Sequence, residues 1–397
     1  MSQTTSATPI PPAVPAAPVP EANPPEAGEF QEKEAQIMVA SQWKLIWWKF
    51  RKHRLAMYSA VVVIAIYTVA LFAEFFEPFP TDLYAANYTY APPQALHLID
   101  TSSGRPKVDL YVTGYKVAID AFSLRRTFVE DPTQKIPVAL LAEGWEYKLL
   151  GIIPMNRHII GPVDGVGPMY LMGADSMGRD LFSRISGGTR ISMSIGLLGV
   201  AISLVLGILL GGISGYYGGA IDNIIQRLIE FLRALPTIPL WMSMAAALPV
   251  TWPPLYVYFG ITLILSFIGW TGLARVVRGR FLALREEDFV LAAKLDGAPP
   301  TYLILRHMAP SFSSHIIASI TLAIPAMILA ETALSFLGLG LRPPVVSWGV
   351  LLQDAQNVRA VATAPWLLAP GIAVVVAVLS LNFLGDGLRD AADPYGR

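Results

Sequence analysis

Long apolar segments with few charges alternate with polar segments over most of the chain. A helix needs roughly 20 apolar residues to cross the hydrocarbon core of a bilayer. Six segments satisfy this requirement, at residues 55–76, 191–213, 224–250, 256–276, 315–337 and 367–384. The pattern predicts an all-α integral membrane protein with six transmembrane helices.

Basic residues predict the orientation of these helices, because cytoplasmic loops are enriched in Lys and Arg. Five basic residues precede the first segment, at Lys44, Lys49, Arg51, Lys52 and Arg54. The N-terminus is therefore expected in the cytoplasm, and six crossings return the C-terminus to the same side. The loop at 277–310 is then cytoplasmic, and the loop at 338–366 is outside.

Polar stretches divide the chain into four regions. Residues 1–40 are rich in Pro and Ala, which predicts a disordered cytoplasmic tail. Residues 41–77 hold an interfacial helix and the first transmembrane helix. Residues 78–185 form a small extracytoplasmic insert, with strands expected at 109–119 and 135–141 and turns at 102–104 and 131–132. Residues 186–397 form a five-helix core with a polar loop at 285–310.

Composition narrows the classes of function. The 397 residues are 54% hydrophobic and 15% charged, with a net charge of zero, so nothing indicates a nucleic-acid partner. There is no cysteine, and the five histidines show no metal-ligand spacing, so no metal site is expected. A phosphate-binding loop requires a Gly-Lys dipeptide, and the sequence contains none. The chain is therefore not expected to be an enzyme, and its energy must come from a partner or from an ion gradient.

Two polar residues inside apolar segments are candidates for a translocation path. Glu331 lies in the segment ITLAIPAMILAETALSFLGL, where a carboxylate costs a few kcal/mol on insertion scales unless it faces an interior or water. It is either a proton or substrate site or a hydrogen-bonded structural carboxylate, and we favour the second interpretation. Asn382 is the other candidate.

Small and charged residues at helical spacing predict contacts between helices. Gly207, Gly211, Gly215 and Gly219 recur every four residues, which places them on one helix face and allows close approach of another backbone. Asp222, Arg227, Glu230 and Arg233 also follow helical spacing. We favour salt bridges at the cytoplasmic mouth over ligand contacts for this second group.

The polar loop predicts a rigid elbow that a cytosolic partner could hold. A helix is expected over 284–294, with Gly297 as its C-terminal cap. The Pro299-Pro300 pair forbids continuation of that helix. A second helix is expected over 301–308, ending before Pro310.

The sequence of this loop resembles the coupling loop of membrane permeases of bacterial ABC importers. The matching positions are Val290, Ala292, Ala293, Gly297, Ala298, Arg306, His307 and Pro310, whereas Leu291, His307 and Ala309 depart from the general signature of that superfamily. Further similar motifs lie at 173–184 (GADSMGRDLFSR), 187–192, 215–222, 330–340, 347–349, 364–366 and 382–393. Together they resemble the C-type permease of the dipeptide, oligopeptide and nickel subfamily.

This resemblance implies a multi-pass permease of the bacterial inner membrane that forms half of a translocation pore. The implied partners are a homologous second permease, two cytosolic ATPases that bind ATP and Mg²⁺, an extracytoplasmic substrate-binding protein and membrane lipid. The implied ATPase-coupling residues are Glu287, Val290, Leu291, Ala292, Ala293, Gly297, Ala298, Arg306, His307 and Pro310. The substrate stays open between oligopeptides and oligosaccharides. The alternative is an ion-coupled secondary carrier that uses Glu331, although a carrier has no need of the elbow.

Overall fold

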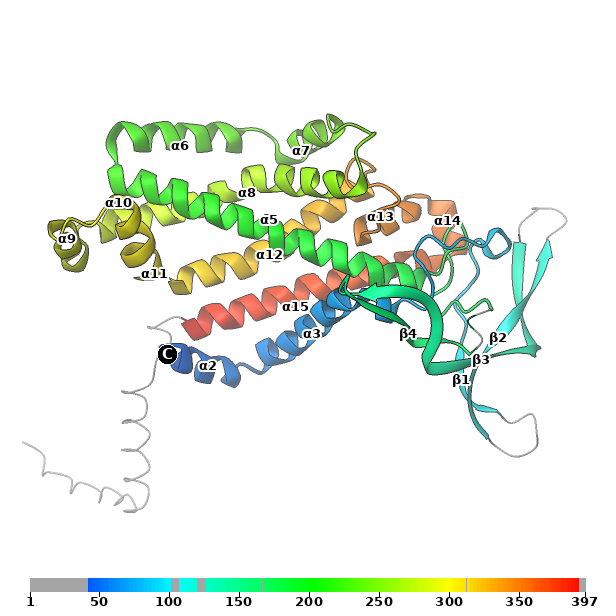
Figure 1. Cartoon of the computed structure of the whole chain (residues 1–397). Helices are drawn as coiled ribbons and strands as arrows, with labels where there is room; N and C mark the ends of the chain where they lie inside the picture. Colours follow the sequence, from blue (N-terminus) through cyan, green and yellow to red (C-terminus); the bar gives the residue numbers. More distant parts are fainter. Residues whose placement is uncertain are drawn as a thin grey trace, which may run out of the picture.

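The computed structural model describes residues 42–100, 107–119, 126–163, 165, 167–311 and 313–392. The predicted tail at 1–40 and the predicted turn at 102–104 lie outside these residues. Long helices form a bundle, and a β-sheet lies at one end of it (Figure 1). The all-α membrane architecture and the β-rich insert after the first span are thus confirmed.

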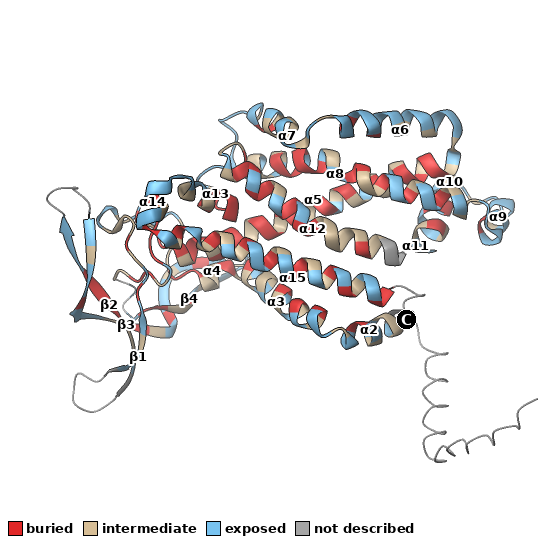
Figure 2. Cartoon of the chain, turned by 180° about the vertical axis from the view of Figure 1, so that it is seen from behind, coloured by how far each residue is buried: buried red, intermediate tan, exposed pale blue. Residues whose placement is uncertain are grey.

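Five helical segments among the described residues are long and apolar enough to cross a membrane. They are Arg54–Leu71 (α3), Leu181–Tyr217 (α5), Pro254–Leu284 (α8), Ile316–Phe336 within α12 (Ser313–Phe336), and Pro365–Ala392, which joins η4 (Pro365–Leu368) to α15 (Ala369–Ala392). The α5 helix contacts α8, α12 and α3, and α15 contacts both α12 and α3. Their shared core includes Met193, Leu265, Ile328 and Leu381. In Figure 2 the buried residues follow the helix faces that meet inside the bundle.

The expected continuous span at 224–250 is wrong, because the structure divides this region into two helices. The first is α6 (Gly219–Ala234) and the second is α7 (Thr237–Ala246). Leu235 between them is extended, with ψ 136°. The ring of Pro236 disfavours a helical conformation at the residue before it, which explains the break. Together the two helices still run along the bundle beside α8 (Figure 1).

The insert is a four-stranded antiparallel sheet in the order β1–β2–β3–β4. Its strands are Leu96–Asp100, Lys107–Ile119, Arg126–Leu149 and Ile153–Pro162. The expected turn at 131–132 lies inside β3, where the pairing changes from Thr113↔Lys135 to Gly114↔Asp131. Asp131 Oδ1 accepts hydrogen bonds from the backbone and hydroxyl of Thr133. The local turn chemistry therefore produces an irregularity within the strand and does not end it.

Short helices complete the two ends of the bundle. At one end are α2 (Gln42–Lys52), α9 (Asp288–Leu295), α10 (Pro300–Tyr302), η2 (Leu303–Met308) and α11 (Ala309–Ser311); at the other are α4 (Ala73–Phe76), η1 (Ala86–Tyr88), α13 (Trp348–Leu352), η3 (Gln353–Gln356) and α14 (Val358–Thr363). The α2 helix packs on the last turn of α15 through Phe50 and Ala391. The described ends of the chain therefore lie at the same end of the bundle as α9.

Candidate functional site

The elbow predicted from the sequence is present, with shifted boundaries. The first helix begins at Asp288, after the N-cap residue Glu287, and not at residue 284, which still belongs to α8. Gly297 has φ +81°, a conformation that favours glycine. The backbone N–H of Ala298 donates to the Ala293 carbonyl, and that of Gly297 to the Lys294 carbonyl. This pair of hydrogen bonds is a Schellman motif, which fixes the direction in which the chain leaves α9.

One side of α9 is anchored to the bundle. Val290 is buried against Val277 and Phe281 of α8 and against Ile304 and Met308 of η2. The resemblance placed Val290 among the ATPase-coupling residues. Its side chain faces the bundle, so any part that Val290 has in coupling is to hold α9 in place.

The opposite side of α9 is exposed and apolar. Leu295 is 89% exposed, and Phe289, Leu291 and Ala292 are also exposed. Ala293, between the two sides, is half-buried. The α9 helix projects beyond the ends of the long helices (Figure 1). An apolar surface of this kind at the tip of a bundle is typical of a protein-binding site.

The second arm of the elbow continues past the position where we expected it to end. The Ala309 N–H donates to the Ile304 carbonyl, five residues back, which defines a π-helical turn over η2. Pro310, which has no N–H, follows inside the short helix α11. The wider turn accommodates the proline without ending the helix. Arg306 is exposed, and the His307 ring packs edge-on to Tyr302 at 5.4 Å between centroids.

Of the four charged residues at helical spacing on α6, Asp222, Arg227 and Glu230 form ion pairs, whereas Arg233 is in none of the ion pairs seen among the described residues. Arg278 of α8 donates to both carboxylate oxygens of Asp222, each at 2.5 Å, and Ser214 of α5 donates to the same carboxylate. The hydrogen bonds from Arg278 hold the pKa of Asp222 below its usual value. Arg227 and Glu230 form a separate exposed pair at 3.0 Å. The first pair ties the start of α6 to α5 and α8.

The glycine row on α5 lies against α8. A Cβ atom on Gly207 would lie 2.9 Å from the Leu273 side chain, on Gly211 2.5 Å from the Ala274 carbonyl oxygen, and on Gly215 2.7 Å from Phe281 Cβ. Gly219 does not belong to this row. It follows the C-cap of α5 with φ +57° and has open space around it, because the chain turns there into α6.

Glu331 lies fully buried where three segments meet. Ser335 and Ser347 donate to its Oε1 at 2.8 and 2.7 Å, and Ser192 of α5 donates to Oε2 at 3.4 Å. Asn382 is half-buried on α15. Gly385, one turn after Asn382 on α15, lies against Thr321 of α12. Thr321 precedes Glu331 on α12 by several turns. The two candidates for the translocation path therefore lie at different depths.

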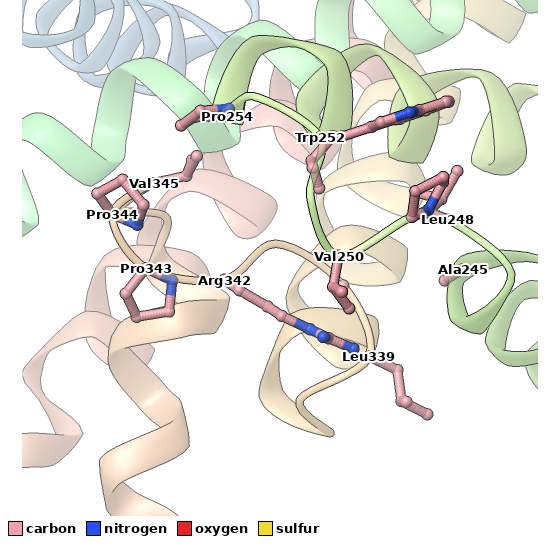
Figure 3. Close-up of a pocket in the computed structure, with 13 residues that line it drawn as sticks. Ala245, Leu248, Val250, Trp252, Pro254, Leu339, Arg342, Pro343, Pro344 and Val345 are labelled. Atoms are coloured by element: carbon pink, nitrogen blue, oxygen red, sulfur yellow. The ribbon is translucent and has the colours of Figure 1, made fainter.

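Sequence reasoning missed a pocket of about 200 Å³ at the end of the bundle opposite α9. It opens between the α7–α8 connection and the loop after α12 (Figure 3). Leu248, Val250, Trp252 and Pro344 line it, and the Arg342 side chain extends across it. Its residues come from distant parts of the chain and share no motif, so no sequence signal could have identified it.

Comparison with known proteins agrees with this architecture. Residues 176–395 match the family of binding-protein-dependent transport system inner membrane components, and residues 41–93 match the N-terminal transmembrane domain of oligopeptide transport permease C. The chain is 38% identical over 231 residues to the dipeptide transport system permease protein DppC of Bacillus subtilis, covering 57% of this chain and 68% of that protein. It is 40% identical over 234 residues to the oligopeptide transport system permease protein OppC of Haemophilus influenzae, covering 57% and 71%.

Two further similarities complete the comparison. The glutathione transport system permease protein GsiD of Pectobacterium atrosepticum is 37% identical over 231 residues, covering 58% of this chain and 74% of that protein. A solved structure of the MetNI methionine ABC transporter in an inward-facing conformation aligns with a TM-score of 0.40 and 16% identity, covering 52% of this chain and 94% of that one. That likeness is too weak to support an argument.

The chain belongs to the family of binding-protein-dependent transport system inner membrane components. It is therefore a multi-pass permease of an ABC importer, which works with an ATPase and a substrate-binding protein. Membership in this family favours the importer over the ion-coupled carrier. In the part of the chain that the structure describes, no group of three or more His, Asp or Glu side chains is arranged to hold a metal ion.

Proposed function

We propose that this chain forms half of a pore for short peptides and that a homologous second permease supplies the other half. The relatives reported above are named for transport of dipeptides, oligopeptides and glutathione, which supports peptides over oligosaccharides. Two cytosolic ATPases bind ATP and Mg²⁺, and an extracytoplasmic binding protein delivers the peptide. The basic residues of α2 favour a cytoplasmic position for both chain ends and for α9.

The exposed apolar face of α9 is the single observation that carries this proposal. Covering a leucine that is 89% exposed makes the free energy of binding more favourable. In this proposal the partner that covers it is an ATPase. The other coupling residues of the elbow surround or support this face: Glu287, Leu291, Ala292, Ala293, Ala298, Arg306, His307 and Pro310.

A continuous set of contacts could transmit movement of α9 into the bundle. Val290 of α9 lies in one buried cluster with Ile304 of η2 and Phe281 of α8. Phe281 in turn lies within 3.0 Å of the position that a Cβ on Gly212 would occupy, and closer still to that of Gly215. Because these contacts are tightly packed, α9, α8 and α5 move together when an ATPase pulls on the elbow. Closure of the two ATPases would then turn the bundle outward.

Gly297→Arg tests the role of the elbow. There is open space around position 297, so the arginine side chain meets no neighbour. The positive φ is unfavourable for any residue with a side chain, by roughly 1–2 kcal/mol, and the substitution therefore distorts the direction of α9. We expect the complex to assemble and hydrolyse ATP while peptide uptake into proteoliposomes is lost.

Gly279→Arg is the matched control for this experiment. Gly279 also has open space around it, but it lies within α8 and has no positive φ. The complex with Gly279→Arg should retain both peptide-stimulated ATP hydrolysis and peptide uptake. If the Gly297→Arg complex also retains both, the proposed role of the elbow is wrong.

A further inference from the structure

The hairpin between β3 and β4 ends in an exposed apolar tip. The five residues at the tip are Leu149, Leu150, Gly151, Ile152 and Ile153. Ile152 is 80% exposed and Ile153 is 51% exposed, and Leu150 is also exposed. A contiguous group of large apolar side chains at the end of a hairpin is unfavourable in water.

The turn itself contains an apolar residue where a polar residue or glycine would fit better. Leu150 has φ +54° and Gly151 has φ +74°, and the Ile152 N–H donates to the Leu149 carbonyl at 3.1 Å. These values define a type I′ turn, whose first central position favours Asn, Asp or Gly. Leucine is strained there. The tip therefore keeps an apolar side chain despite both backbone strain and exposure.

The direction of the hairpin carries this tip back toward the membrane. Near its base, Val138 lies in the cluster that also contains Phe79. Further along, Trp145 donates to the Glu77 carbonyl and His158 Nδ1 lies 2.9 Å from the Glu74 carbonyl oxygen. Going from the base of the hairpin to its tip, its contacts move from Phe79 to Glu74. The tip therefore points toward the outer end of α3.

The hairpin is long enough to reach the lipid. Ile153 lies five residues beyond His158, which corresponds to roughly 15 Å at the rise of a β-strand. The last turn of the membrane-spanning helix α3 ends at Leu71, just before Glu74. In Figure 1 the hairpin labelled β4 lies over the outer ends of the long helices, whereas β1 and β2 lie beyond them.

The residues just above the tip are those that favour a membrane interface. The half-buried Trp145 ring lies 5.3 Å, between centroids, from the buried ring of Tyr147, and the exposed side chain of Lys148 follows. Arg157 on β4 is also exposed, but it lies further from the tip, opposite Glu143, and forms an ion pair with it at 3.4 Å. Tryptophan and tyrosine concentrate at the level of lipid headgroups, and lysine extends its charge toward water from there. From Trp145 toward the tip, β3 thus carries two aromatic residues with the exposed Glu146 between them, then Lys148, and then the apolar residues.

We propose that this hairpin tip inserts into the outer leaflet of the membrane, at the boundary between headgroups and acyl chains. Deeper insertion is excluded because the edges of a two-stranded ribbon carry unpaired backbone groups. The acyl chains cover Leu150, Ile152 and Ile153, and lipid phosphates accept from Lys148. The insert is thereby held at a fixed height above the bundle. This inference does not depend on the transported substrate.

A single spin label tests the proposal in the assembled transporter. Because this chain has no cysteine, Ile152→Cys provides one unique attachment site within it. The complex, with cysteines of the other subunits removed, is reconstituted in vesicles of phosphatidylethanolamine and phosphatidylglycerol. Power saturation then compares collisions of the label with oxygen, which concentrates in the bilayer, and with a water-soluble nickel chelate.

Ile119→Cys is the matched control, because Ile119 is an isoleucine of the same insert and is 65% exposed. It lies at the end of β2, which is beyond the ends of the long helices (Figure 1). The label at 152 should collide several-fold more with oxygen, relative to the chelate, than the label at 119. Equal chelate access at both sites overturns the proposal. Protection of site 152 from both reagents also overturns it, since that result indicates a protein partner.

Discussion

The carboxylate of Glu331 connects α12 to α5 and α13 through serine hydroxyls. A buried carboxylate could be identified from the sequence as an exceptional residue in an apolar segment. Its partners could not, because Ser192 and Ser347 are distant in the chain and become neighbours only when the bundle forms. This geometry favours a structural role, in which one carboxylate satisfies several buried hydroxyl groups.

Substitution of Glu331 separates the structural role from a role in transport. Glu331→Ala leaves the buried hydroxyls of Ser335 and Ser347 without their acceptor, so we expect a loss of stability of about 1–3 kcal/mol. Glu331→Gln retains an acceptor oxygen and should retain most of the stability. Thermal unfolding of the purified complex measures both effects. If Glu331→Gln abolishes uptake while stability is unchanged, Glu331 belongs to the translocation path.

Val290 shows a limit of motif matching at the scale of a residue. The motif identified the correct segment, and the alternation of exposed and buried positions in α9 follows from helical spacing. However, a motif does not indicate which matched residues face a partner and which face the protein. Val290 packs inward because Phe281 and Met308 reach it from other segments.

Among the elements, the hairpin of the insert contacts the C-terminal end of α4 at Glu77, whose carboxyl group is buried. Glu77 is almost fully buried beneath the hairpin, and its carbonyl accepts from Trp145. Burial, and then the neighbouring Glu74 carboxylate, raise the pKa of Glu77 from 4.5 to about 8. The folded protein thus holds this proton more tightly than the unfolded chain does.

This shift predicts a pH dependence of stability. The contribution of Glu77 is fully present below about pH 4.5 and is lost as the pH rises through about 8, because only the unfolded chain releases the proton readily in that window. Glu77→Gln should therefore reduce the fall in unfolding temperature between these two pH values. Glu146→Gln, at an exposed position of the same hairpin, should not. An unchanged pH profile for Glu77→Gln would contradict this account of the contact.

The broken crossing of α6 and α7 shows what hydropathy alone cannot decide. The apolar content of 224–250 is sufficient for a span, but Pro236 and the ion pair of Asp222 with Arg278 determine where helices begin and end. The proline was visible in the sequence. The ion pair was not, because it depends on how α8 packs beside α6.

For the whole molecule, the sequence was sufficient for the architecture and insufficient for its contacts. Apolar segments and the turn residues of the elbow act locally, so the long helices, the β-rich insert and the turn at Gly297 could be predicted. The pocket at Arg342, the serine partners of Glu331 and the return of the hairpin toward the membrane depend on contacts between distant segments. Such contacts leave no periodic pattern in a single sequence.

The central claim is that α9 is the surface on which an ATPase acts. A photoreactive amino acid in place of Leu295 tests it most directly in the assembled complex. The same replacement at Leu98, 62% exposed in strand β1 at the other end of the molecule, is the control. We predict a covalent adduct with an ATPase subunit from position 295 and none from position 98. If position 295 yields no ATPase adduct in a complex that transports peptide, the claim is contradicted.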